Sequence, residues 1–169
     1  MIIRPETPAD YEAITQVTLA AFTSASYRPT EHLIILGLRQ TGALSLSLVA
    51  ELDGRIIGHV AFSAVRVNGE DLDWYGLGPI SVRPELHKQG IGSKLIQEGL
   101  SRLQARAAKG CVLLGSPGYY QRFGFKAYPG LIYEEAPAPE YFMAIAFCDE
   151  IPQGNVEYHS AFYSHPTSG

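Results

Sequence analysis

The sequence predicts one α/β domain with a mixed sheet, in which an antiparallel meander adjoins a central parallel strand pair and helices flank the sheet. In the middle of the chain, apolar residues alternate with other residues, and the tight-turn pairs Asp53-Gly54 and Asn68-Gly69 separate the alternating runs. A long amphipathic helix lies between the last strand of the meander and a short buried strand. Strand, helix and strand in that order imply that the two strands pair in parallel.

The chain is expected to begin with a short strand, at residues 1–4, and two helices. Residues 7–10 are typical of a helix start: the threonine can cap, the proline suits the first helical position, and the aspartate lies near the positive end of the helix dipole. Thr30 starts a second helix, which Gly42 ends. Apolar residues at helical spacing continue the first helix, namely Ile14, Val17, Ala21 and Phe22.

The meander and the parallel unit are predicted between residues 46 and 114. Alternation places strands at residues 46–52, 55–67 and 72–82. Residues 91–109 have the best helix pattern of the chain, with one apolar and one polar face. A short buried strand follows at residues 111–114, and we expect it to lie parallel to the third strand of the meander.

The last part of the chain is predicted to hold shorter elements. Residues 117–122 have the pattern of a short helix that Gly124 ends. The proline-rich segment after residue 128 is expected to be a loop. Two further strands are predicted on either side of this loop, at residues 125–128 and 141–147.

The length of 169 residues suits a single domain. We expect residues 1–150 to form this domain and residues 151–169 to form a loose C-terminal tail, either packed on the same domain or free of it.

Composition and charge exclude several classes of protein. The net charge is −4 and no basic stripe is visible, which argues against a nucleic-acid binder. No apolar run approaches ~18 residues, so no membrane span is predicted. The first residues do not resemble a signal peptide. Cys111 and Cys148 both lie in apolar runs, which predicts buried thiols and a reducing compartment, so we expect a cytoplasmic protein.

Residues 87–93 have the features of an anion site. A helix is predicted to begin near Ile91, and the first turn of a helix presents unpaired N–H groups. Gly90 and Gly92 lack a Cβ where a diphosphate would approach the backbone, Ser93 offers a hydroxyl and Lys88 a positive charge. Alternatively, the two glycines only make a tight turn. Neither the P-loop motif nor the dinucleotide-binding fingerprint is present.

Several segments of the chain resemble the GNAT superfamily of N-acetyltransferases. They are residues 78–84, then Gln89-Gly90-Ile91-Gly92 with the long helix, and then Tyr119-Tyr120-Gln121-Arg122-Phe123-Gly124-Phe125. His87 departs from the Gln or Arg that opens the first family motif, whereas the second motif is complete. The resemblance covers residues 1–150 in element order and is most specific at residues 78–125.

The resemblance implies that acetyl-CoA is the acyl donor. It implies that Ile80, Ser81 and Val82 offer backbone groups to the pantetheine arm, and that residues 89–93 hold the pyrophosphate. It also implies that the strands of Ile80 and Leu113 splay apart where the cofactor enters. The complete set of expected cofactor-binding residues is Ile80, Ser81, Val82, His87, Lys88, Gln89, Gly90, Ile91, Gly92, Ser93 and Tyr119.

Acetyl transfer to a primary amine, by direct attack in a ternary complex, needs a proton acceptor, an oxyanion donor and a proton donor for the thiolate. Tyr120 matches the family's tyrosine and is the expected catalytic donor; the alternative is that it only packs beside Phe123 and Phe125. A backbone N–H at or near Val82 can polarise the thioester carbonyl. No base is assigned, and the candidates are Asp73, Tyr75 and Glu31.

Other chemistry has little support in the sequence. His32, His59, His87, His159 and His165 show no metal-ligand spacing, so we expect no metal, and the serine elbow of hydrolases is absent. By analogy, residues 29–38 and 131–140 flank the pocket of a small-molecule or peptide amine. In that second segment, Glu134, Glu135 and Glu140 either favour a cationic acceptor or form a solvated loop. A non-catalytic acyl-CoA-binding or regulatory domain is the alternative function, and a homodimer is compatible with the sequence.

Overall fold

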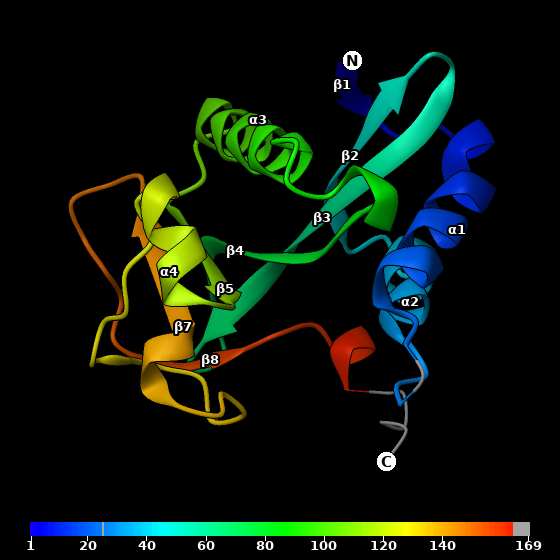
Figure 1. The fold of residues 1–169 in the computed structure, drawn as a ribbon. Helices are drawn as coiled ribbons and strands as arrows, with labels where there is room; N and C mark the ends of the chain where they lie inside the picture. Colours follow the sequence, from blue (N-terminus) through cyan, green and yellow to red (C-terminus); the bar gives the residue numbers. More distant parts are fainter. Residues whose placement is uncertain (25, 164–169) are drawn as a thin grey trace.

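The computed structural model describes residues 1–24 and 26–163 and shows one mixed sheet with helices on both faces (Figure 1). The strand order is β1-β2-β3-β4-β5-β7, and β8 pairs with both β3 and β6. The strands are β1 (Ile2–Pro5), β2 (Leu44–Leu52), β3 (Arg55–Val67), β4 (Glu70–Val82), β5 (Gly110–Leu114), β6 (Leu131–Ile132), β7 (Phe142–Ala146) and β8 (Gly154–Glu157). The helices are α1 (Tyr11–Phe22), α2 (Glu31–Gln40), α3 (Ile91–Ala105) and α4 (Pro117–Tyr120), and the 3-10 turns are η1 (Pro8–Asp10), η2 (Pro84–Leu86), η3 (Gln121–Phe123), η4 (Pro139–Tyr141) and η5 (Ser160–Phe162).

The antiparallel meander and the parallel pair are both present, as the sequence predicts. β1, β2, β3 and β4 pair with their neighbours in antiparallel register, and β4 pairs with β5 in parallel. Side chains alternate between the faces, so one face of the sheet packs against α3 and the other against α1 and α2. The α3 side holds the largest core cluster, which includes Leu48, Phe62, Leu95 and Leu103.

The parallel pair opens partway along its length. Its last paired residues are Gly76 in β4 and Val112 in β5, although β4 continues to Val82 on its other edge, where it pairs with β3. Beyond Val112, β5 pairs with β7 only. The segment Ile80–Val82 therefore has one free side, which faces the gap between the two strands.

Two of the elements expected from the sequence differ in the structure. The long helix ends at Ala105 rather than Lys109, because Ala107 adopts a left-handed conformation (φ 63°) and the Lys109 N–H donates to the Asp73 carbonyl (2.9 Å). Residues 125–128 do not form a strand; Lys126 makes an isolated bridge to Ala144.

The segment after Pro152 is not a loose tail as far as residue 163. It forms β8 on the edge of β3 and then η5, and it buries Val156, Tyr158 and Ala161. β8 has only 4 residues, and an alternating pattern of that length is too short to identify from the sequence. The end of the expected tail, residues 164–169, and with it His165, lies outside the described residues.

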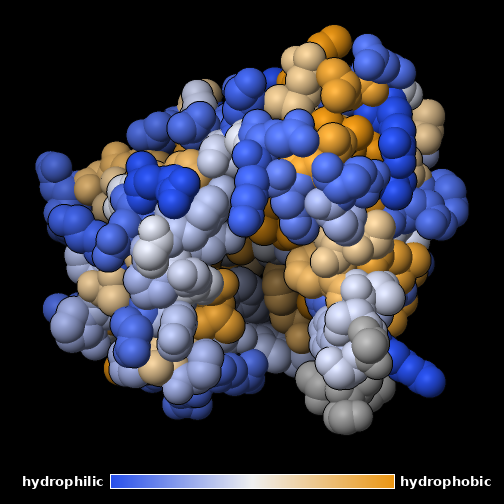
Figure 2. All heavy atoms as spheres, viewed as in Figure 1, coloured by the Kyte–Doolittle hydropathy of each residue, from blue (hydrophilic) through white to orange (hydrophobic). Residues whose placement is uncertain are grey.

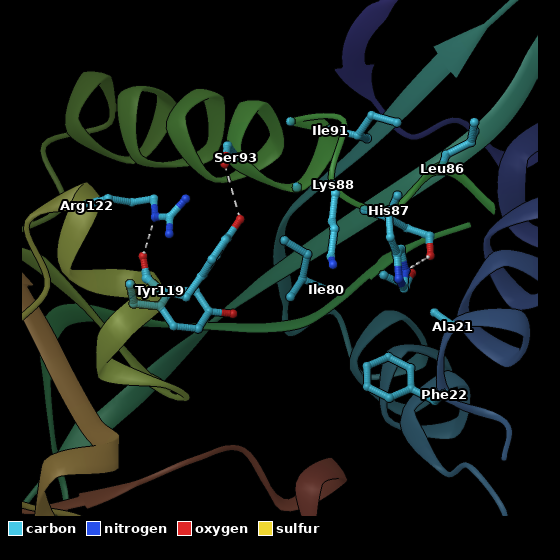
Figure 3. A pocket seen from close by; sticks show the side chains of 15 residues that line it. Ala21, Phe22, Ile80, Leu86, His87, Lys88, Ile91, Ser93, Tyr119 and Arg122 are labelled. Atoms are coloured by element: carbon cyan, nitrogen blue, oxygen red, sulfur yellow. Dashed lines mark hydrogen bonds between the residues drawn. The ribbon is translucent and has the colours of Figure 1, made fainter. Parts of the chain in front are cut away.

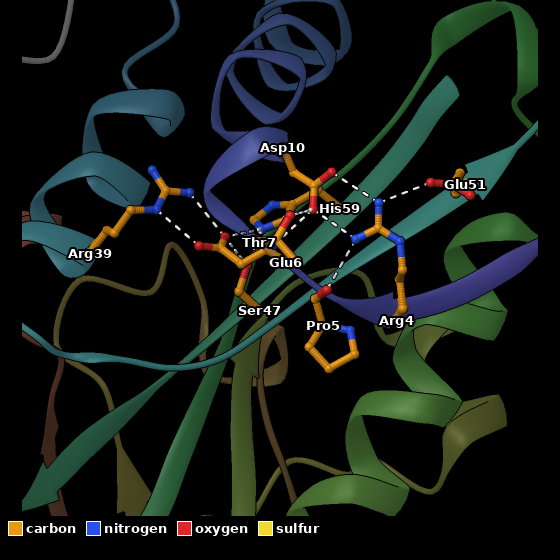
Figure 4. Close-up of polar contacts among 9 residues, drawn as sticks. All are labelled: Arg4, Pro5, Glu6, Thr7, Asp10, Arg39, Ser47, Glu51 and His59. Carbon is orange, nitrogen blue, oxygen red and sulfur yellow. Dashed lines mark hydrogen bonds and ion pairs between the residues drawn. The ribbon is translucent and has the colours of Figure 1, made fainter. Parts of the chain in front are cut away.

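A buried polar network joins the start of the chain to the sheet below α1 and α2 (Figure 4). Arg39 donates two hydrogen bonds to Glu6, at 3.0 Å each, and the Ser47 hydroxyl also donates to Glu6. The Ser47 oxygen lies 2.7 Å from His59 Nε2. The position of His59 after Gly58 in a strand predicts a residue at the edge of the core, whereas the structure buries this side chain completely. Because Ser47 donates to Glu6, His59 Nε2 carries the proton in this arrangement.

The two cysteines differ in exposure. Cys111 is a buried free thiol, as expected, whereas Cys148 is exposed, because it follows β7 where the chain leaves the sheet. Among the described helices, none has the length and apolar character that crossing a bilayer requires.

Candidate functional site

A cavity of about 660 Å³ lies where β4 and β5 separate, between the start of α3, α4 and the end of α1. Figure 2 shows the corresponding hollow between two parts of the surface, with apolar side chains on its walls. The lining residues are Ala21, Phe22, Ile80, Ser81, Val82, Leu86, His87, Lys88, Gly90, Ile91, Gly92, Ser93, Tyr119, Tyr120 and Arg122. Tyr120 and the expected cofactor-binding residues thus lie together here, except for Gln89, which is exposed and not part of the lining.

The start of α3 presents free backbone donors to this cavity. Gly90 adopts a left-handed conformation (φ 81°), and no side chain of the described residues caps the helix there. The first bond of the helix is the one from Lys94 N–H to the Gly90 carbonyl (3.1 Å), so the N–H groups of Ile91, Gly92 and Ser93 precede it. A Cβ on Gly92 would lie 3.5 Å from the Tyr119 hydroxyl, so this glycine widens the cavity beside the helix start.

The charges around the cavity have one sign. Lys88 and Arg122 are among its described lining residues, and no aspartate or glutamate is. Figure 3 shows Lys88 and Arg122 on opposite sides of the start of α3. Together with the positive end of the α3 dipole, these side chains make the cavity suitable for a polyanion.

Tyr119 and its neighbours form the wall below α3. The Tyr119 hydroxyl lies 3.2 Å from the Ser93 Oγ, and the Arg122 Nε donates to the Tyr119 carbonyl at 2.8 Å (Figure 3). The Arg122 guanidinium also lies over the Tyr119 ring, 4.5 Å from its centroid. These contacts hold Arg122 at the cavity with part of its hydrogen-bonding capacity still available.

His87 makes a contact that the sequence did not predict. Its Nε2 lies 3.0 Å from the carbonyl oxygen of Val82, the last residue of β4 (Figure 3). A histidine therefore joins the loop before α3 to the strand that borders the cavity. Its side chain is exposed and still contributes to the lining.

Tyr120 is positioned by a glycine. A Cβ on Gly115 would lie 2.4 Å from the Tyr120 Cε2, so the ring occupies space that another residue would fill. Burial, followed by the proximity of Tyr119, raises the pKa of Tyr120 above its ordinary value. The phenol is thus protonated at neutral pH and can donate a proton. It also packs edge-on against Tyr119 and Phe125, so both functions expected for it are compatible with the geometry.

The three residues considered as a base do not line this cavity. Both Glu31 carboxylate oxygens accept hydrogen bonds from the Tyr27 hydroxyl, at 2.9 and 2.7 Å. Asp73 lies at the far end of β4, where its carbonyl accepts from Lys109. Tyr75 packs against the core cluster below α3.

Four lining residues were not predicted from the sequence as part of the site: Ala21, Phe22, Leu86 and Arg122. The first two looked like core positions of α1, and only tertiary packing shows that the end of this helix borders the cavity. Arg122 lies within the second motif, so its charge was a signal that could have been used. Within residues 1–24 and 26–163, no cluster of His, Cys, Asp or Glu could hold a metal ion.

The chain is similar to known acetyltransferases in sequence. A family model described as an acetyltransferase (GNAT) domain matches residues 44–127. YhbS of Escherichia coli K12, named as an uncharacterized N-acetyltransferase, is 37% identical over 168 residues, which cover 96% of this chain and 98% of that protein.

Solved structures agree with this similarity. A GNAT family acetyltransferase from Brucella melitensis, in complex with acetyl-CoA, is 50% identical with a TM-score of 0.85, over 95% of this chain and 97% of that one. YhbS from Escherichia coli, in complex with CoA, is 35% identical with a TM-score of 0.89, over 99% and 94% of the two chains.

Proposed function

The chain belongs to the GNAT superfamily of acetyltransferases, and we propose that it transfers the acetyl group of acetyl-CoA to a primary amine by direct attack in a ternary complex. The amine nitrogen forms a bond to the thioester carbonyl carbon, the carbon–sulfur bond breaks, and coenzyme A leaves as the thiol. The amine gives up one proton to water and the thiolate receives one. The observation that carries this proposal is the basic cavity at the uncapped start of α3.

The pyrophosphate is assigned to the backbone N–H groups of residues 91–93, with Lys88 and the Ser93 hydroxyl beside them. Free N–H groups, a helix dipole and an absence of carboxylates in the described lining all favour a diphosphate. Gly90 and Gly92 support the assignment, because the backbone is accessible where they lack a Cβ. The complexes of the two similar structures with acetyl-CoA and CoA support the choice of donor.

The pantetheine arm is assigned to the free side of Ile80, Ser81 and Val82. This edge is unpaired because the β4–β5 ladder ends at Gly76 and Val112, so its backbone groups can bond to the amides of the arm. The side chain of Ser81 is buried and its Oγ lies 3.5 Å from the Thr18 Oγ, which leaves the backbone as the part that meets the ligand. A backbone N–H near Val82 would polarise the thioester carbonyl.

Tyr120 is assigned as the acid that protonates the departing thiolate, and it regains its proton from solvent. Its position in the cavity supports this role, and burial, which raises the pKa of Tyr120, keeps the phenol protonated at neutral pH. Since Asp73, Tyr75 and Glu31 lie outside the lining, we propose that water accepts the proton of the amine rather than one of these side chains.

Two measurements on the whole protein test this function. Calorimetry should show that coenzyme A binds, and an assay of thiol release should show that acetyl-CoA is consumed faster when a primary amine is added. Mass spectrometry of the product should show one acetyl group on the amine. Thiol release without any amine is the control for hydrolysis. Tight binding of coenzyme A with no acetylation across a broad amine panel would contradict the enzymatic proposal and favour a regulatory acyl-CoA-binding domain.

A further inference from the structure

Arg122 is a second cation in the wall of the cavity at the start of α3, and the sequence analysis did not expect it there. It lies in η3, directly after α4, and its side chain is exposed while it lines the cavity. Figure 3 shows Arg122 on the α4 side of the helix start, whereas Lys88 lies on the opposite side. The two cations are therefore placed to contact different parts of one bound polyanion.

The guanidinium of Arg122 is held in place by Tyr119. Its Nε donates to the Tyr119 carbonyl at 2.8 Å, and its central carbon lies 4.5 Å from the centroid of the Tyr119 ring. The Tyr119 hydroxyl in turn lies 3.2 Å from the Ser93 Oγ, so the pair is connected to the first turn of α3. The arginine is thus ordered before a ligand binds, which lowers the entropic cost of binding.

Most of the hydrogen-bonding capacity of Arg122 is still available. A guanidinium has five N–H donors, and within the protein only the one on Nε is used. Among the described residues, no carboxylate forms an ion pair with Arg122, and no acceptor contacts its two Nη atoms. Free Nη groups in the wall of a cavity whose described lining has no carboxylate suit an anion that can accept two parallel hydrogen bonds.

The ribose 3′-phosphate is the part of coenzyme A that fits these Nη groups best. The pyrophosphate is assigned to the N–H groups of residues 91–93 with Lys88 beside them, so it already has its partners. The 3′-phosphate is a monoester, and such a group carries a charge of about −1.5 to −2 at neutral pH and has three terminal oxygens. The planar fork of an arginine matches such a group in a bidentate manner, which a lysine cannot do.

We propose that Arg122 binds the ribose 3′-phosphate of coenzyme A and thereby selects acetyl-CoA over donors that lack this phosphate. The inference rests on the proposed function and specifies how its site recognises the donor. It places the adenosine end of the cofactor on the α4 side of the helix start, beyond the pyrophosphate.

Calorimetry with coenzyme A and with 3′-dephospho-coenzyme A, which differ only in this phosphate, tests the inference on the whole protein at low ionic strength. The wild-type protein should bind coenzyme A roughly five- to tenfold more tightly, because a charge-assisted pair at an exposed arginine has a modest effect. Arg122→Gln should bring the ratio of the two Kd values to about one by weakening the binding of coenzyme A only. Arg122→Lys keeps the charge without the fork and should give an intermediate ratio.

Two lysine variants are matched controls, because each removes one positive charge near the same helix start. Lys94 is exposed and does not line the cavity, so Lys94→Gln should change the ratio of Kd values by less than about twofold. Lys88→Gln should weaken the binding of both ligands by a similar factor, since both contain the pyrophosphate.

The outcomes separate this inference from the function it rests on. Equal affinity of the wild type for the two ligands, or a ratio that Arg122→Gln leaves unchanged, would overturn the inference and leave the proposed function standing. A ratio that is lost in a lysine variant instead would also overturn it, by assigning the 3′-phosphate to that lysine. Discrimination that depends on Arg122 in a protein that acetylates no amine would support the inference, and only the proposed transfer reaction would fail.

Discussion

The Nε2 atom of His87 lies 3.0 Å from the carbonyl oxygen of Val82 and so fixes the loop before α3 to the end of β4. These two segments form adjoining walls of the cavity at the start of α3, which we propose holds the acyl donor and call the donor cavity. Since Val82 accepts a hydrogen bond there, Nε2 is the donor and carries the proton. The histidine at this place, where the family pattern has glutamine or arginine, thus positions the loop before α3 through a contact within the protein.

Replacing His87 should weaken the binding of acetyl-CoA more than it slows the transfer of the acetyl group. His87→Ala removes one hydrogen bond, worth about 0.5–1.5 kcal/mol, so we expect KM for acetyl-CoA to rise roughly two- to tenfold with a smaller change in kcat. His87→Gln keeps an N–H donor and should recover most of the loss. Steady-state kinetics at saturating amine measures both values. Wild-type KM in the alanine variant would show that the contact has no role in binding.

A carboxylate introduced at Gly90 should repel the phosphates of coenzyme A. Gly90→Asp places a negative charge beside the free N–H groups of α3, so the Kd of coenzyme A measured by calorimetry should rise by about tenfold or more, and less at high salt. Gly42→Asp is the matched control. Gly42 also has a left-handed backbone, with φ 74° against 81° for Gly90, and neither would place a Cβ within 4 Å of another atom.

The two aspartate variants should lose similar stability through backbone strain, roughly 1 kcal/mol each. Only the variant at Gly90 should lose affinity, because Gly42 does not line the donor cavity. Equal affinities of the two variants for coenzyme A would place the pyrophosphate elsewhere.

Removing the Tyr120 hydroxyl should slow acetyl transfer without weakening the binding of coenzyme A. In Tyr120→Phe the ring still fills the space beside Gly115, so the Kd of coenzyme A should stay within about twofold of the wild-type value. Loss of a general acid should lower kcat by roughly 100-fold. Single-turnover kinetics would measure the transfer step directly. An unchanged rate would leave Tyr120 with a packing role only.

The sequence predicted the turns of the meander and the start of α3 well because these features are local. The turn pairs at Asp53 and Asn68 and the helix start at Gly90 each depend on a few neighbouring residues, and β3 has the predicted bounds. The positions of Ala21 and Phe22 depend instead on how α1 packs across the sheet, which periodicity does not specify. β8 was missed for the same reason, since its 4 residues pair with strands far away in the sequence.

The candidate bases also show that periodicity does not specify tertiary position. Asp73 is a candidate because the third strand of the meander is expected to border the acceptor site, but β4 has 13 residues and Asp73 lies at the end away from Val82. A residue's strand can be predicted from alternation, whereas its distance from the reacting atoms depends on where two strands separate. The acidic residues Glu134 and Glu135 were recognised as either a solvated loop or an acceptor contact, and only the tertiary structure places them in a cavity with Glu157.

His59 should make the folded protein less stable in weak acid. Burial, with the charge of Arg39, lowers the pKa of His59 from 6.5 to about 4, although Glu6 opposes this shift. Between these pH values the unfolded chain binds more protons than the folded one, so stability falls as the pH drops from 6.5 toward 4, by up to roughly 3 kcal/mol.

Urea unfolding at several pH values measures the effect of His59. His59→Gln keeps an N–H donor for Ser47 and should remove most of the slope between pH 6.5 and 5. The pair of Arg4 and Asp10 acts at lower pH and serves as an internal reference. Hydrogen bonds from Arg4 hold the pKa of Asp10 at about 2 instead of 3.8, so its contribution is present above pH 3.8 and is lost as the pH falls toward 2. A variant with an unchanged slope above pH 5 would assign the acid sensitivity to another group.

Because α3 packs closely on β3, replacing Gly99 in α3 by alanine should lower the stability of the protein. Alanine normally stabilises a helix relative to glycine by about 1 kcal/mol. At Gly99, however, a Cβ would lie 2.3 Å from the Cζ of Phe62, whose side chain is completely buried and cannot move aside. Overpacking of this kind costs about 1–3 kcal/mol, so Gly99→Ala should destabilise the protein despite its better helix propensity.

Ser101→Ala, at an exposed position of the same helix, tests propensity alone and should be neutral or slightly stabilising. Urea unfolding of both variants would compare them, and a Gly99→Ala protein more stable than the wild type would show that α3 can move away from the sheet without loss of packing.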